Sequence, residues 1–129
     1  MMNGLSFKVE YPEPGVVRFC LFYDNEEIAF TIINYNVDKA GPWLTNLYVK
    51  PAYRNRGYAK LLLNTVKTKI KRRPLFLKVW AYEDNTKSDD ELIAMYKMFG
   101  FKEIPNNPKK LRLDESFKAF FDKRGNHDD

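Results

Sequence analysis

The sequence predicts a single α/β (α+β) domain with a mixed central sheet of about seven strands and two main helices. Three observations predict this fold. Apolar, β-branched and aromatic residues dominate the chain up to Val49, in short runs that turn residues separate. Two segments with helical periodicity follow, with one apolar run between them. Two short strand-like runs come last, and the length of 129 residues suits one domain.

The N-terminal part of the chain has the pattern of an antiparallel sheet. Residues 5–11 alternate apolar and polar side chains and should form a strand, which the Pro/Gly segment 12–15 is expected to end. Residues 16–23 and 27–35 are rich in β-branched and aromatic side chains around an Asp-Asn-Glu turn, so they predict a hairpin. Residues 43–49 are mostly apolar, which is typical of a central strand.

Residues 57–73 have the pattern of an amphipathic helix. Its apolar face, at three- and four-residue spacings, consists of Ala59, Leu62, Leu63, Val66 and Ile70. The last turn is expected to hold cations, which suit the negative end of the helix dipole: Lys69, Lys71, Arg72 and Arg73. Pro74 should end the helix, and residues 75–82 should form the next strand.

The second predicted helix begins at Ser88, because Ser88 and Glu91 have the spacing of a capping box. A glycine at position 100 is a natural end for this helix, and Phe101 should pack back on its last turn. Residues 101–104 and 110–113 are the two remaining strand-like runs, around a loop rich in proline and asparagine.

The composition indicates a folded protein outside the membrane. The net charge is +5, and 44% of the residues are hydrophobic, which is enough for a core. The single cysteine, Cys20, cannot form an internal disulfide and should be buried. Residues 1–15 lack the apolar core of a signal peptide, and no apolar run approaches the ~20 residues that span a bilayer. We expect a cytoplasmic protein with one domain at residues 1–121 and a frayed polar tail at 122–129.

The segment from Val49 to Lys60 carries the strongest functional signal. A predicted strand runs into a short basic loop, and the loop becomes a helix at Gly57. Unpaired backbone N–H groups and the positive end of the helix dipole then meet at one spot, where a phosphate group can bind. Arg54, Arg56 and Lys60 would add positive charge there, and a side chain at position 57 would crowd the anion.

Two motifs in this order resemble those of a known family. Arg54-Asn55-Arg56-Gly57-Tyr58-Ala59 resembles the acetyl-CoA loop of the GNAT N-acetyltransferases, and Leu47-Tyr48-Val49 with Pro51 is similar to the strand that precedes that loop. Residues 94–101 resemble the second motif of the family, a helix that carries a tyrosine and ends in Gly-Phe. The resemblance covers residues 43–104, which is most of the predicted domain.

The resemblance implies acetyl-CoA as the co-substrate, with no metal, and direct acetyl transfer to an amine. The pantetheine arm would lie between two splayed parallel strands, residues 43–49 and 75–82. Backbone N–H groups of Leu47 and Val49 would hold it, and that of Leu47 would polarise the thioester carbonyl. The coenzyme-binding residues predicted in this way are Leu47, Tyr48, Val49, Arg54, Asn55, Arg56, Gly57, Tyr58, Ala59 and Lys60, with Asp89 where the family often has asparagine.

Tyr96 is the predicted general acid. An unperturbed tyrosine has a pKa of ~10 and can protonate a leaving thiolate at neutral pH. The alternative is that Tyr96 only packs on the apolar face of its helix. Many protein-directed members carry a catalytic glutamate where this chain has Trp43, so the base would be another carboxylate. The candidates are Glu83, Asp84 and Asp89, acting directly or through a water.

The turn at residues 11–16 leaves no room for the two N-terminal helices that are usual in the family. The acceptor side would be open, which suits a protein lysine or N-terminus better than a small metabolite. A homodimer is one way to cover the apolar surface left by the missing helices. The short plan, with a Leu-Ile-x-x-Tyr helix, is also similar to a small anti-CRISPR acetyltransferase, which suggests a phage or mobile-element effector.

Two other classes of function stay open at this point. Residues 67–73 form a dense basic run, with further cations at 109–112, and could bind nucleic acid. Against this, cations at a helix C-terminus already have a dipole explanation. A GNAT-like fold without the strand glutamate could also bind acetyl-CoA and transfer nothing.

Overall fold

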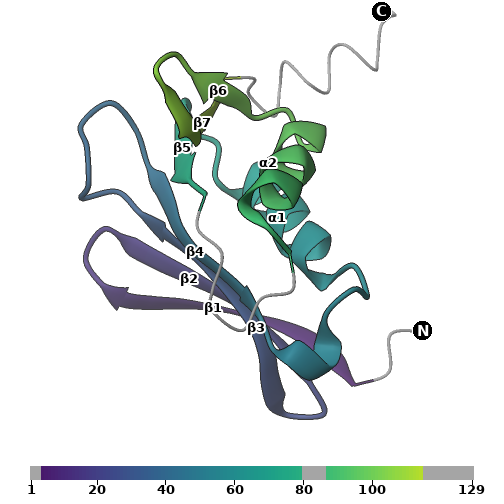
Figure 1. Cartoon of the computed structure of the whole chain (residues 1–129). Helices are drawn as coiled ribbons and strands as arrows, with labels where there is room; N and C mark the ends of the chain where they lie inside the picture. Colours follow the sequence, from purple (N-terminus) through teal and green to yellow (C-terminus); the bar gives the residue numbers. More distant parts are fainter. Residues whose placement is uncertain (1–3, 80–86, 115–129) are drawn as a thin grey trace, which may run out of the picture.

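The protein forms a mixed seven-stranded sheet with two α-helices on one face, in a computed structural model that describes residues 4–79 and 87–114 (Figure 1). Within these residues the strand order is β1-β2-β3-β4-β5-β7-β6. Neighbouring strands are antiparallel, except for the parallel pair β4 and β5. The predicted α/β fold, with seven strands and two helices, is therefore confirmed.

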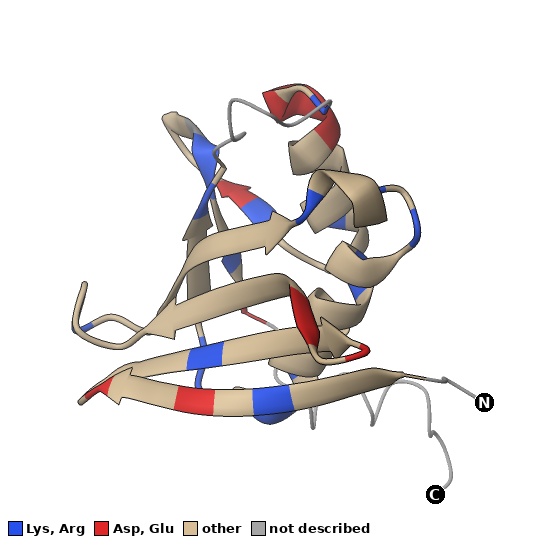
Figure 2. Cartoon of the chain, turned by 90° about the horizontal axis from the view of Figure 1, so that it is seen from below, with Lys and Arg blue, Asp and Glu red and all other residues tan. Residues whose placement is uncertain are grey.

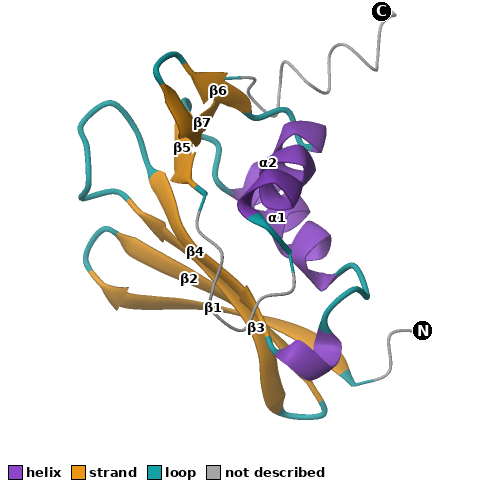
Figure 3. Ribbon diagram, viewed as in Figure 1, coloured by secondary structure: helices purple, strands orange, loops and turns teal. Residues whose placement is uncertain are grey.

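The elements follow one another in the predicted order, as Figure 3 shows. The strands are β1 (Leu5–Glu13), β2 (Val16–Tyr23), β3 (Glu26–Asn34), β4 (Trp43–Val49), β5 (Leu75–Lys78), β6 (Lys102–Ile104) and β7 (Asn107–Leu113). The helices are η1 (Pro51–Tyr53), α1 (Tyr58–Lys69) and α2 (Asp89–Met98), where η1 is a single 3₁₀ turn. The predicted tail, 122–129, lies outside the described residues.

Strand β1 continues through the proline that was expected to end it. It runs to Glu13 because it is an edge strand, where a residue without an N–H can be accommodated. The register with β2 shifts between Glu10 and Glu13, so Pro12 lies in a bulge. The prediction that the strand ends at residue 11 was wrong for this reason.

Helix α1 is shorter than predicted and ends at Lys69. Ile70 is already extended (φ −93°, ψ 104°), and its side chain is buried in the core. Arg73 therefore lies beyond the helix, but its guanidinium folds back and donates to the carbonyl oxygens of Lys67 and Ile70. Lys67 and Lys69 occupy the last turn of α1, so the prediction of cations there is confirmed for Lys69. The other predicted cations lie beyond the helix, and from there Arg73 satisfies the terminal carbonyl oxygens.

The core lies between the sheet and the two helices. Leu62, Leu63 and Val66 of α1 are at most 1% exposed, as the three- and four-residue spacing predicted. The one buried polar residue in the described core is Thr31, whose hydroxyl donates to the carbonyl oxygen of Asn46 at 2.6 Å. This packing fixes α1 and α2 beside the central strand β4.

Strands β4 and β5 pair over only two residue pairs, Trp43 with Phe76 and Leu44 with Leu77. Residue 45 is an extra residue in β4, because the register with β3 shifts at this point. After residue 45, β4 remains paired with β3, while β5 remains paired with β7, so β4 and β5 separate. The described part of the predicted strand 75–82 ends at Lys78, and residues 80–82 lie outside the described residues.

Candidate functional site

A groove of about 290 Å³ lies where β4 separates from β5, beside the start of α1 and one face of α2. It brings together most of the residues that the sequence singled out. These are Leu47, Tyr48, Val49, Arg54, Asn55, Gly57, Tyr58, Ala59, Lys60 and Tyr96. Three separate elements therefore contribute to one concave site, although their ligand stays a prediction.

The backbone of β4 directs polar groups into the groove. The Lys50 N–H donates to the Ile28 carbonyl oxygen at 2.8 Å, so even-numbered residues at this end of β4 point their backbone groups towards β3. Leu47 and Val49 then point theirs to the opposite side, where β5 has already separated. Their N–H groups have no strand partner among the described residues, as a ligand that lies along β4 would require.

The start of α1 presents further N–H groups. Gly57 precedes the helix with a φ of 87°, which favours glycine, and open space surrounds the position where a Cβ would stand. The first bond of the helix joins the Leu61 N–H to the Gly57 carbonyl oxygen at 3.0 Å. The N–H groups of Tyr58, Ala59 and Lys60 precede that bond and have no partner within the helix. All three of these residues line the groove.

The three cations of the loop differ in whether they line the groove. Arg54 lines the groove, donates from Nε to the Val49 carbonyl oxygen at 2.7 Å and places its guanidinium over the ring of Tyr48. Lys60 also lines the groove. Arg56 is not among the lining residues, and its guanidinium lies over the ring of Tyr53, 5.6 Å from the centroid. The positive charge expected from all three is thus centred on Arg54 and Lys60.

Tyr96 reaches the groove from α2. It is 6% exposed and packs edge-on against Phe101, with ring centroids 5.9 Å apart. Gly100 has a φ of 99°, and the Phe101 N–H donates to the Tyr96 carbonyl oxygen at 3.3 Å. The predicted Gly-Phe ending of the helix is confirmed. These contacts pack the ring and also orient it at the groove. The environment of Tyr96 therefore agrees with a role as general acid and with a role in packing alone.

The predicted carboxylates lie elsewhere. Asp89 does not line the groove, and its carboxylate forms an ion pair with Lys109 at 2.7 Å. Glu83 and Asp84, the other two base candidates, lie outside the described residues. No acidic side chain is among the described residues that line the groove. Trp43, in the place of the family's glutamate, stacks on Phe76 with ring centroids 5.1 Å apart.

Sequence reasoning missed four lining residues. Leu92 and Met95 lie on the apolar face that also carries Tyr96, so helical spacing could have identified them. Lys87 adds a cation just before α2, and nothing in its sequence context marks it. Tyr53 comes from η1, and its hydroxyl donates to Glu26 at 3.4 Å. Partial burial and the Glu26 carboxylate both raise the pKa of Tyr53, so this phenol is neutral at physiological pH.

Residues 5–101 match the family model described as the acetyltransferase (GNAT) family. The chain belongs to the GNAT acetyltransferase family. The matching span contains every described residue that lines the groove. The family resemblance drawn from the two motifs is therefore confirmed, whereas the likeness to an anti-CRISPR acetyltransferase stays a prediction.

Solved structures of GNAT and related acetyltransferases share this fold. An acetyltransferase from Thermus thermophilus has a TM-score of 0.60 and 16% identity, over 78% of this chain and 64% of that one. The ribosomal-protein-S18-alanine N-acetyltransferase from Escherichia coli has a TM-score of 0.62 and 22% identity, over 81% and 72%. The PaiA N-acetyltransferase from Thermoplasma acidophilum, solved in complex with coenzyme A, has a TM-score of 0.56 and 20% identity, over 78% and 61%.

These comparisons establish fold and family for this GNAT chain and leave its substrate open. The chain spans less than two thirds of the Thermus and Thermoplasma proteins. A search of curated protein sequences found no match. Within residues 4–79 and 87–114, no group of three or more histidine, cysteine or acidic side chains could hold a metal ion. No helix in the same residues has the length and apolarity needed to span a membrane.

Proposed function

We propose that the groove binds acetyl-CoA and that the protein transfers the acetyl group directly to an acceptor amine. The observation that supports this most is the convergence on one groove of backbone N–H groups from β4 and from the start of α1 that have no partner among the described residues. Membership of the GNAT acetyltransferase family adds to it. The pyrophosphate would lie at the start of α1, and the pantetheine arm would run along β4 beside Leu47 and Val49.

The thioester would lie between Leu47 and Tyr96. The N–H of Leu47 would donate to the thioester oxygen as negative charge develops on it. The acceptor nitrogen would form a bond to the thioester carbon as the C–S bond breaks, and the proton that nitrogen loses would pass to solvent water. Tyr96 would protonate the departing sulfur, which is a task for a neutral phenol close to the leaving group, and would regain its proton from solvent. Tyr96 is nearly buried at the groove, so water would compete poorly for that proton transfer.

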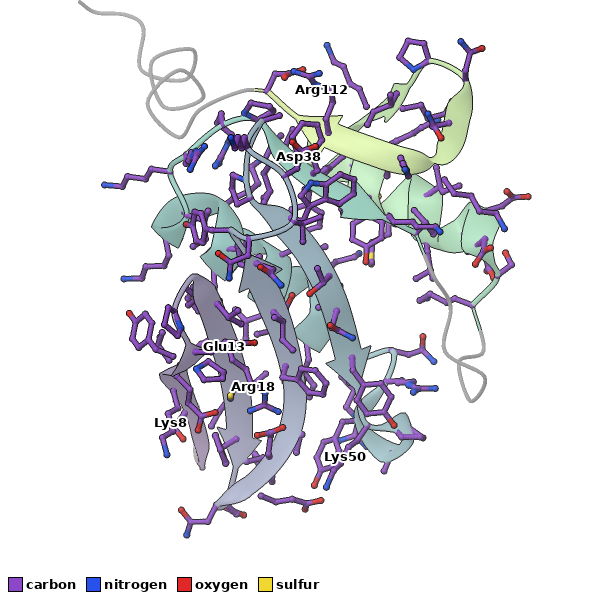
Figure 4. All side chains as sticks on the ribbon, turned by 90° about the vertical axis from the view of Figure 1, so that its left-hand side faces the viewer. Lys8, Glu13, Arg18, Asp38, Lys50 and Arg112 are labelled. Carbon is purple, nitrogen blue, oxygen red and sulfur yellow. The ribbon has the colours of Figure 1, made fainter. Side chains whose placement is uncertain are left out.

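Direct transfer is favoured because the described part of the groove offers no side chain suited to form a covalent acetyl intermediate. No cysteine or serine is among its described lining residues. Cys20 lies on β2, and its thiol contacts the Arg18 guanidinium, which Figure 4 labels on the sheet face opposite the helices. Burial raises the pKa of the Cys20 thiol to about 11, so this group stays protonated and unreactive.

The acceptor would be an amine on a protein, either a lysine or an N-terminus. Strands β1 and β2 are joined by Pro14 and Gly15 alone, so no helix stands between them. A small metabolite would need a pocket that buries most of its surface. An open side accepts a flexible chain more readily, since only the reacting amine has to enter.

A second candidate function is acetyl-CoA binding without transfer. It is favoured by the absence of an acidic side chain among the described lining residues. A protonated lysine amine, with a pKa of ~10.4, must lose a proton before it attacks. A protein of this kind would bind the coenzyme tightly and release no free coenzyme A.

The deciding experiment combines binding with transfer. Calorimetric titration with coenzyme A tests the groove, and mass spectrometry of lysate incubated with the protein and isotope-labelled acetyl-CoA tests the reaction. We expect micromolar binding and label on one or a few proteins. Binding without any label or free thiol would support the second candidate, and no binding would contradict both.

A further inference from the structure

Strand β1 has a free edge with backbone groups available for pairing. It is the first strand in the sheet order, so only β2 pairs with it among the described residues. The Asp24 N–H donates to the Gly4 carbonyl oxygen at 2.8 Å, which fixes the alternation along β1. Ser6, Lys8 and Glu10 therefore direct their backbone groups to β2. Leu5, Phe7 and Val9 direct theirs to the free edge.

The side chains of β1 form an exposed apolar row on the helix side of the sheet. Phe7 and Val9 pair with Leu21 and Phe19, whose side chains are buried in the core, so they share that face. Phe7 is 45% exposed, Val9 42% and Tyr11 74%. Neither helix extends over β1 in Figure 1. Three large apolar side chains at alternate positions of an edge strand are typical of an interface.

The other face of β1 carries charges of both signs. The Lys8 Nζ lies 3.6 Å from the Glu10 Oε2, and the two side chains are 63% and 36% exposed. Figure 2 shows basic and acidic residues along the strand next to the N-terminus, and Figure 4 labels Lys8 on the face away from the helices. The charges and the apolar row are arranged symmetrically about Val9, in the order Phe7-Lys8-Val9-Glu10-Tyr11.

We propose that two copies of this chain pair through antiparallel β1 strands, with a two-fold axis at Val9. Val9 then lies opposite Val9 of the second copy, and each Phe7 lies opposite a Tyr11. On the other face each Lys8 lies opposite a Glu10. The backbone groups of Val9 and Phe7 that point to the free edge supply the hydrogen bonds. The two sheets become continuous, and the apolar rows cover each other.

The charges select this register over its neighbours. A two-fold axis at Lys8 would place Lys8 opposite Lys8 of the second copy. An axis at Glu10 would place Glu10 opposite Glu10 of the second copy. Like charges directly opposite each other in a sheet are destabilising. An axis at Phe7 would leave Lys8 facing Ser6 and Glu10 facing Gly4. Only the axis at Val9 matches apolar with apolar side chains and opposite charges on both faces.

Position-specific cross-linking tests the proposal. Opposed residues of a hydrogen-bonded antiparallel pair have Cα atoms about 5.5 Å apart, which a disulfide can bridge. Val9→Cys should therefore form a covalent dimer under mild oxidation, seen as an intact mass of twice the chain. In Phe7→Cys the two thiols would be four residues out of register, or about 13 Å apart, and should not join. The double variant Phe7→Cys/Tyr11→Cys should join again.

Sedimentation equilibrium of the wild-type protein supplies the independent measurement. We expect a mass of twice 15.3 kDa at micromolar concentration. Lys8→Glu would oppose two carboxylates on each side of the axis and should weaken the dimer about tenfold. Ser6→Glu, on the same strand and face, should leave it unchanged because its partner position is Pro12.

Two outcomes would overturn the proposal. A monomeric wild-type mass would remove the dimer, and equal cross-linking of Val9→Cys and Phe7→Cys would remove the register. Wild-type Cys20 is 0% exposed and should not cross-link, so unmodified protein is the blank for each oxidation. Coenzyme binding is measured separately, so failure of the dimer and failure of the groove are distinguishable.

Discussion

The two α-helices begin in opposite ways. Helix α2 has a complete capping box, in which the Glu91 N–H donates to the Ser88 hydroxyl at 3.2 Å and the Ser88 N–H donates to Glu91 at 2.9 Å. Its first turn is acidic throughout. Helix α1 begins after Gly57 with no side-chain cap and no acidic residue in its first turn, and Lys60 lies there instead.

The difference between the two helix starts suits one for helix stability and the other for ligand binding. A capped helix start satisfies its own N–H groups and neutralises its dipole, so it has little to offer an anion. An uncapped start that lines a groove keeps both available for a ligand, at a cost in helix stability. Helix α2 is therefore stabilised by its own first turn, while the uncapped start of α1 has the features that the proposed coenzyme site requires.

The largest expected effect comes from making the start of α1 acidic. Arg56→Glu with Gly57→Glu should abolish coenzyme A binding, because two carboxylates would replace a cation and the φ of 87° disfavours any side chain. Calorimetric titration measures the loss. The control, Asn64→Glu with Lys71→Glu, changes the net charge equally at exposed positions in and just after α1. Retained micromolar affinity in the first variant would contradict the loop assignment.

The next effect concerns chemistry at the groove and leaves binding intact. Tyr96→Phe should lower turnover at least about tenfold, because the leaving thiolate would lose its proton donor, with coenzyme affinity unchanged. Tyr58→Phe removes a hydroxyl from the same groove and should keep full turnover. Release of free thiol from acetyl-CoA is the measurement. Equal activity of both variants would leave Tyr96 with a packing role only.

A single substitution can give α1 the character of α2. Lys60→Glu places an acid in the first turn of α1, where it should stabilise the helix by about 0.3–1 kcal/mol. The same change should weaken coenzyme binding about tenfold, or about 1.4 kcal/mol. Thermal unfolding without ligand and titration at two salt concentrations measure the two effects. A Lys60→Glu variant that lost stability and kept full coenzyme affinity would contradict the idea that the start of α1 favours binding over stability.

The converse substitution removes the cap of α2. Ser88→Ala should cost about 1 kcal/mol of unfolding free energy, because the Glu91 N–H loses its acceptor. Coenzyme affinity should stay the same, since Ser88 does not line the groove. Chemical denaturation and titration are sufficient to test this. A large loss of affinity would mean that the start of α2 belongs to the binding site.

The smallest effect is a pH dependence of the same cap. The hydrogen bond from the Ser88 backbone N–H lowers the pKa of Glu91 in the folded protein. The carboxylate therefore stabilises the fold above its ordinary pKa, and this contribution is lost as the pH falls through the lowered value. The stability difference between wild type and Glu91→Ala should be present at neutral pH and shrink in acid. A difference that stayed constant would contradict the assigned cause.

The sequence predicted the elements better than their ends. The bounds of β4 and the cap at Ser88 followed from local patterns, since apolar runs and capping spacings act within a few residues. The end of α1 did not, because Arg73 satisfies the carbonyls from beyond the helix. The path of β1 past Pro12 depends on its place at the sheet edge, which only the tertiary fold decides.

The candidate site was predictable where backbone geometry defines it. All residues from Arg54 to Lys60 except Arg56 line the groove, because a strand, a glycine and a helix in sequence produce that shape. The ion pair of Asp89 with Lys109 and the contribution of Lys87 join segments that are distant in the sequence, so no local signal marked them. Glu83 and Asp84, outside the described residues, stay predictions.

The two residue pairs between β4 and β5 leave the two halves of the sheet joined by a short seam. A pantetheine arm in the gap would take the place of a strand between β4 and β5 and would hydrogen-bond to the free side of β4. Ligand binding of this kind adds to folding stability by mass action. Acetyl-CoA bound in this gap would therefore raise the free energy of unfolding, by an amount that grows with its free concentration.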